Sequence, residues 1–141
     1  MAKTTNDIQS EIIENFSLFE DDMESTLFYL MDLGKKIPSM PDAHKTDAYI
    51  VRGCQSKVWL YPAIKEGKVF FEADSNTEIT KGLISLLISL WNNRTPDEIL
   101  DTELFFIDKI GMSRMIGSQR SNGFASMIRQ MKLYALAYKN Q

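Results

Sequence analysis

The hydrophobic period of this sequence changes twice, and this change constrains the fold more than any other feature. Residues 8–33 carry apolar side chains three or four positions apart, which is the spacing of one face of an α-helix. Between residues 49 and 74 the side chains alternate with a period of two, as they do in a β-strand. Helical spacing returns from residue 79 to residue 135. The sequence therefore predicts an α+β domain, with helices packed on a small antiparallel sheet.

The first 36 residues are expected to form two helices. Asn6 and Gln9 are spaced like a capping pair at the start of the first helix. The second helix follows the acidic run at residues 20–22, where the helix dipole favours negative charge. Pro38 stops helix formation and begins a loop that is expected to run to about residue 46.

Three short strands are expected in the middle of the chain. Residues 49–51 form a β-prone run, and two alternating runs follow at residues 58–64 and 69–74. A hairpin turn is expected between the last two runs, because Gly67 tolerates a positive φ angle. Cys54 would then lie in the loop that connects the first strand to the second.

Two sequence pairs indicate where later helices begin. Ser75 and Glu78 have the spacing of a capping box, and Thr95 and Glu98 repeat it. The last helix is expected to begin near Ser118.

Length, charge and hydropathy limit the class of protein. The 141 residues suit one domain that covers residues 1–141. The net charge of −3 and the scattered lysines and arginines argue against a nucleic acid or anionic membrane partner. The longest apolar stretch, residues 82–91, has about half of the ~20 residues that a membrane span requires. The N-terminus shows no secretory signal, so a cytoplasmic protein is expected.

Cys54 is the only cysteine, so this chain alone forms no disulfide and offers too few thiolates for a zinc or iron–sulfur site. A lone cysteine is most often a small buried hydrophobe. The neighbours of Cys54 favour a functional role instead. Gly53 precedes it and indicates an unusual backbone angle, while the polar Gln55 and Ser56 follow it.

Two chemical roles for the thiol can be compared from the residues alone. Arg52 and Lys57 flank Cys54 and are expected to lower its pKa toward the reactive thiolate, at a loop tip that could reach another protein. A hydrolase would instead pair Cys54 with His44, the only histidine. This pairing is disfavoured, because the two residues are only ten positions apart and loop histidines are usually exposed. The sequence contains no phosphate loop, dinucleotide fingerprint or metal-spaced cluster.

The segment Val51-Arg52-Gly53-Cys54-Gln55-Ser56-Lys57-Val58-Trp59 resembles the cysteine signature of the SufE-type sulfur acceptors. Further segments resemble landmarks of that family in the same order along the chain: residues 29–38, 73–76, 81–83, 94–99 and 120–124. Gln119 departs from the pattern, since the family more often has Ser or Thr before the arginine that matches Arg120.

The resemblance implies a sulfur-transfer protein rather than a stand-alone enzyme. SufE-type proteins take sulfur from the persulfide of a cysteine desulfurase, stimulate that enzyme, and pass the sulfur on for iron–sulfur cluster assembly. The partners implied are a SufS-like or related desulfurase, which carries pyridoxal phosphate, and a SufB-containing scaffold complex. No cofactor or metal of the chain's own is expected. The acceptor would be Cys54, and the residues expected to support it or to bind the partner are Arg52, Gly53, Gln55, Ser56, Asp74 and Arg120. The alternative is a non-catalytic adaptor or scaffold component, which would tolerate loss of the thiol.

Overall fold

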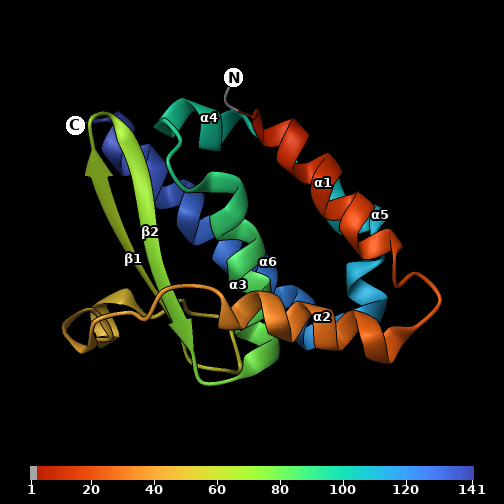
Figure 1. Cartoon of the computed structure of the whole chain (residues 1–141). Coiled ribbons are helices and arrows are strands. Elements are labelled where there is room, and N and C mark those ends of the chain that lie inside the picture. Colours follow the sequence, from red (N-terminus) through yellow and green to blue (C-terminus); the bar gives the residue numbers. More distant parts are fainter. Residues whose placement is uncertain (1–2) are drawn as a thin grey trace.

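The computed structural model describes residues 3–141 and confirms an α+β fold (Figure 1). Its elements are α1 (Thr5–Ser17), α2 (Met23–Lys35), the 3₁₀ turns η1 (Asp42–His44) and η2 (Asp47–Tyr49), β1 (Val58–Lys65), β2 (Lys68–Ser75), α3 (Glu78–Trp91), α4 (Pro96–Asp101), α5 (Phe106–Lys109) and α6 (Met112–Lys139).

The sheet of the described residues has two strands, β1 and β2, which pair antiparallel. A two-residue turn joins them, with φ of 54° at Glu66 and 78° at Gly67. Positive φ at both central residues is typical of the type I′ turns that match the twist of a hairpin. The predicted hairpin is therefore confirmed.

The expected first strand at residues 49–51 is wrong. The segment before it winds into η2, and only Ile50 forms an isolated bridge, to Trp59 on β1. Tyr49 packs edge-on against Tyr61, with 4.7 Å between the ring centroids, so its aromatic side chain serves packing on the hairpin rather than a strand ladder. The backbone N–H of Val51 still donates to the carbonyl of Val58 at 2.8 Å. Cys54 therefore lies in a loop between a single bridge and β1.

The predicted capping pairs differ from the observed caps at two of three helix starts. The Thr95–Glu98 capping box is confirmed at α4. At α1 the capping box is formed by Thr4 and Asp7 instead of Asn6 and Gln9. At α3 the N-cap is Thr77, whose own N–H donates to Ser75 Oγ.

Gln9 does not cap a helix but bonds to the backbone of a distant turn. Its side chain is fully buried. The amide group donates to the carbonyl of Glu103 at 3.0 Å and accepts from the N–H of Phe105 at 2.8 Å. Because buried backbone groups require partners, Gln9 stabilises the turn that leads into α5.

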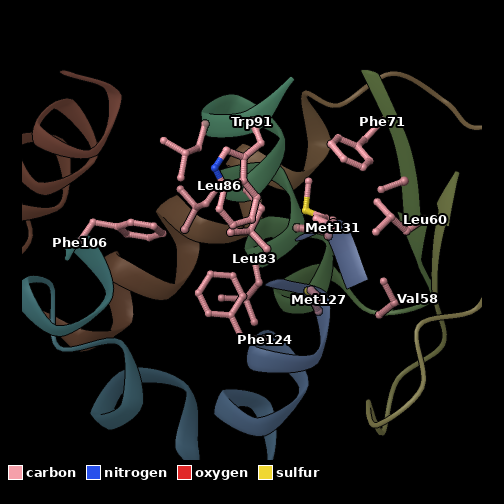
Figure 2. Close-up of a cluster of buried hydrophobic side chains, with 14 of the residues drawn as sticks. Val58, Leu60, Phe71, Leu83, Leu86, Trp91, Phe106, Phe124, Met127 and Met131 are labelled. Atoms are coloured by element: carbon pink, nitrogen blue, oxygen red, sulfur yellow. The ribbon is translucent and has the colours of Figure 1, made fainter. Parts of the chain in front are cut away.

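The core lies between the inner face of the hairpin and the helices α3 and α6 (Figure 2). Side chains from these elements and from α5 meet there: Val58, Leu60, Phe71, Leu83, Leu86, Trp91, Phe106, Phe124, Met127 and Met131. Helix α2 crosses α3 at very short distance. A Cβ on Gly82 would lie 2.2 Å from the Leu30 carbonyl oxygen, so this crossing requires glycine.

Helix α6 is interrupted at Gly117, where φ is 85° and ψ is 168°. This combination is accessible essentially only to glycine. The long helical segment therefore restarts at Ser118, as predicted, after one preceding turn that begins at Met112. The interruption places the first turn of the second segment beside the Cys54 loop.

Candidate functional site

Cys54 lies against α6. Its Sγ donates a hydrogen bond to the carbonyl oxygen of Gly123, with 3.4 Å between the two atoms. The thiol is half-buried, so it lies in a loop as predicted but not at an exposed tip.

Two glycines allow the loop to approach the helix this closely. Gly53 has a φ of +96°, and a Cβ at this position would lie 2.5 Å from Ser126 Oγ. A Cβ at Gly123 would lie 3.3 Å from Cys54 Sγ. Gly123 and Ser126 are three residues apart and share a helix face, so the loop packs against small residues there. This spacing is visible in the sequence, but the role of Ser126 was not predicted from it.

Burial raises the pKa of the Cys54 thiol. The prediction that Arg52 and Lys57 would lower this pKa is wrong, because burial is the only cause of the shift. Both cations are exposed, where water screens their charge. The thiol is therefore protonated near neutral pH in the structure described here.

A cavity of about 360 Å³ opens beside Cys54. The cysteine loop, α3 and both segments of α6 line it, through Cys54, Gln55, Ser56, Thr80, Leu83, Ile116, Gly117, Ser118, Gln119, Arg120, Gly123 and Met127. The break at Gly117 makes the first turn of the second helical segment part of the wall. A water molecule occupies about 30 Å³ in the liquid, so a small group attached to Sγ has room here.

Gln55 and Ser56 both line this cavity, and Ser56 fixes the loop to the start of α3. Ser56 Oγ lies 3.0 Å from Thr77 Oγ1 and accepts from Thr80 Oγ1 at 3.4 Å. The N–H of Lys57 donates to the side-chain oxygen of Asn76 at 3.0 Å. The loop is thus held on the α3 side as well as on the α6 side.

Asp74 does not line the cavity and acts instead as an anchor. Its carboxylate lies 2.7 Å from Lys45 Nζ and 3.4 Å from Lys81 Nζ. Burial raises the pKa of Asp74, but hydrogen bonds from Lys45 and from the Ser75 N–H outweigh burial, so the net pKa is lowered. The contacts tie the chain segment before the cysteine loop to β2 and α3.

The two predicted arginines take different positions. Arg120 is exposed and lines the cavity, and its guanidinium donates to the Ile116 carbonyl at 3.5 Å. Arg52 is exposed in the turn that precedes Gly53.

His44 is engaged away from Cys54. Its Nδ1 lies 3.1 Å from Glu72 Oε2, and its ring stacks on Tyr61 with 3.6 Å between the centroids. The Cys54–His44 pair of a hydrolase is therefore not formed. Residues 3–141 also contain no group of three or more His, Cys, Asp or Glu side chains placed to hold a metal ion. None of the described helices has the length and apolarity needed to span a membrane.

Comparison with known proteins identifies the relatives of this chain. The family model described as "SufE: Fe-S metabolism associated domain" matches residues 10–135. An uncharacterized SufE-like protein of Rhizobium meliloti is 34% identical over 127 residues, which are 86% of this chain and 90% of the relative. An uncharacterized SufE-like protein of Synechocystis is 33% identical over 133 residues, covering 92% of this chain and 81% of the relative.

A solved structure shares the same fold. The solution structure of a hypothetical protein from Thermus thermophilus superposes with a TM-score of 0.78 and covers 95% of this chain and 97% of its own. The two sequences are 16% identical, so this likeness concerns the fold alone.

Proposed function

The chain belongs to the SufE family, which implies a role in Fe–S metabolism, and on this premise we propose that Cys54 is a sulfur acceptor. The donor is the persulfide of a pyridoxal-phosphate-dependent cysteine desulfurase of the SufS-like or a related type. The protein stimulates that enzyme and delivers the sulfur to a SufB-containing scaffold in the cytoplasm. The observation that carries the proposal is the position of the only thiol on a 360 Å³ cavity within the matched region.

The transfer is a nucleophilic displacement at sulfur. The Cys54 thiolate attacks the outer sulfur of the donor persulfide, a new S–S bond forms on Cys54, and the donor's own S–S bond breaks. The donor cysteine leaves as a thiolate and takes up the proton that Cys54 has lost. The products are a Cys54 persulfide and a free donor thiol, so no external oxidant or reductant is consumed.

The surroundings of Cys54 support a carrier because they leave space for the added sulfur and hold no competing thiol. The cavity beside Sγ has room for one more atom. A second cysteine could attack the persulfide and release sulfide, and this chain has none.

The other residues support the site without reacting. Gly53 allows the close approach of the loop to α6. Gln55 and Ser56 line the cavity, and Asp74 anchors the preceding segment. Arg120 adds positive charge at the cavity wall, where a persulfide anion would form.

The direct test is intact-mass analysis after incubation with a cysteine desulfurase and cysteine. We expect the mass of one sulfur atom, or of a short polysulfide, on Cys54, and removal of that mass by dithiothreitol. Cys54→Ser is the matched control, because serine is nearly isosteric but its hydroxyl stays protonated and cannot replace the thiolate. This variant should bind the desulfurase without stimulating it. Full stimulation by Cys54→Ser would establish the adaptor alternative and reject the carrier.

A further inference from the structure

Four exposed cations lie around the cysteine loop in a protein whose net charge is −3. Arg52 and Lys57 belong to the loop itself, and Arg120 lines the cavity. Arg129 joins them from α6, because its Nη2 donates at 3.4 Å to Ser126 Oγ, directly beneath Gly53. We call these four residues the cationic rim.

The rim is not neutralised within the described chain. None of its members forms an ion pair with a carboxylate of residues 3–141. The carboxylate of Asp74 is not available to the rim, because it is paired with Lys45 and Lys81.

Activation of the thiol does not explain these charges, since burial alone shifts its pKa. Their composition is typical of a binding surface instead. The rim holds three of the chain's five arginines, and arginine is the charged residue that protein interfaces favour.

We propose that the cationic rim is the docking surface for the protein that donates sulfur to Cys54, and that this donor presents carboxylates around its own persulfide. The inference rests on the proposed carrier function and adds the chemistry of the partner's surface to it. Charges at the rim of an interface act mainly by steering diffusional encounter and by fixing the orientation of docking. The rim would therefore orient Cys54 toward the donor persulfide.

The test uses the chain of residues 1–141 and a purified cysteine desulfurase. Arg52→Glu reverses a rim charge in the cysteine loop, and Arg129→Glu reverses a rim charge on α6. Lys65→Glu is the matched control, because β1 carries Lys65 about 25 Å away from the loop. Lys65 is also exposed and forms no ion pair within residues 3–141.

At about 0.05 M NaCl, each rim reversal should raise the protein concentration for half-maximal stimulation roughly tenfold, with the maximum unchanged. Lys65→Glu should leave that concentration within about twofold of wild type. At about 0.5 M NaCl the difference between wild type and the rim variants should largely disappear, because salt screens exposed charges.

The outcomes separate this inference from the carrier function. If the desulfurase loads Cys54 with sulfur but the rim variants saturate like wild type at both salt concentrations, the docking inference is overturned and the carrier function stands. If the rim variants weaken binding while Cys54 stays unloaded, docking is supported and the carrier function fails. Absence of any binding by the wild type rejects both. Binding of a DNA duplex that the same reversals abolish, with no effect on the desulfurase, would assign the rim to nucleic acid and overturn the inference.

Discussion

Burial and nucleophilicity oppose each other at Cys54. The thiolate is the form that attacks a persulfide, yet burial raises the pKa of this thiol and favours the protonated form. Each unit of pKa above the ambient pH lowers the thiolate fraction about tenfold. The isolated protein therefore keeps the Cys54 thiol in a weakly reactive form. Under the proposed function, contact with the sulfur donor would activate it.

The first prediction concerns the reactivity of this thiol. At about pH 7.5, iodoacetamide should alkylate Cys54 in the folded protein at least roughly threefold more slowly than in the urea-unfolded chain, because the raised pKa and half-burial both reduce attack. The rate in the folded protein should keep rising above the pH at which the unfolded chain levels off. Mass spectrometry of timed samples measures both rates. A folded-state rate equal to or above the unfolded-state rate would show that the thiol is activated in the free protein.

A second prediction tests whether the small residue Gly123 holds the cysteine loop against α6. Gly123→Ala adds a Cβ that would lie 3.3 Å from Cys54 Sγ, so the loop has to move by a few tenths of an ångström. Alanine also favours a helix over glycine by about 1 kcal/mol, so the variant should stay folded. We expect faster alkylation of Cys54 with little change in the urea midpoint. Leu133→Ala, at an exposed position further along the same helix, is the control and should not speed alkylation. Equal rates in both variants would mean that Gly123 does not hold the loop.

At the scale of elements, the sequence predicts what local spacing determines. The alternating runs and Gly67 specify the hairpin, and Thr95 with Glu98 specifies the start of α4. Local spacing does not predict the role of a residue whose contacts lie far away in the sequence. The spacing of Gln9 predicts a capping residue, but its side chain bonds to a turn 94 residues away.

Residues 49–51 show the same limit. Their β-prone composition predicts a strand, but Tyr49 packs on Tyr61. In the segment just before them, His44 stacks on Tyr61 and Lys45 pairs with Asp74. These contacts hold the segment as two 3₁₀ turns on the hairpin. The segment leads directly into the cysteine loop, so its anchors also position Cys54.

A third prediction concerns the anchor Asp74. Its lowered pKa means that the folded state favours the carboxylate more strongly than the unfolded chain does. The stabilisation is therefore complete above the unfolded-state pKa of about 3.9 and is lost as pH falls through the lower folded-state value. Asp74→Asn should reduce the free energy of unfolding by about 1 kcal/mol at neutral pH, and the difference from wild type should shrink toward about pH 3.

Urea unfolding across this pH range measures the effect. Asp42→Asn is the control, because the Asp42 side chain is fully exposed and lies 3.8 Å from the same lysine. It should match wild type at every pH. A difference for Asp74→Asn that stays constant from neutral pH to about pH 3 would show that packing, and not charge, is what Asp74 contributes.

At the scale of the whole molecule, the site is assembled from parts that are remote in sequence. Cys54 and Gly123 are 69 positions apart, yet the carbonyl of one accepts from the thiol of the other. The cysteine loop and the start of the last helix are each recognisable in the sequence. Their contact around the cavity depends on how α6 packs in the fold and on the break at Gly117. A single sequence does not encode these distances in any local pattern. The half-burial of the thiol and the position of Arg129 beside the cysteine loop were therefore not predicted.

The last prediction follows from the metal-binding side chains that the sequence contains. With one cysteine and one histidine, and with His44 held by Glu72 and Tyr61, the purified monomer should bind neither zinc nor an iron–sulfur cluster at stoichiometric level. Elemental analysis after dialysis measures this directly. A cluster shared between two chains could use one Cys54 thiolate from each, so the mass in solution should be determined on the same sample. Cys54→Ser is the control, since it removes the only thiolate. About one zinc ion or two iron ions per chain, lost in that variant, would make the chain a scaffold component and reject a pure sulfur carrier.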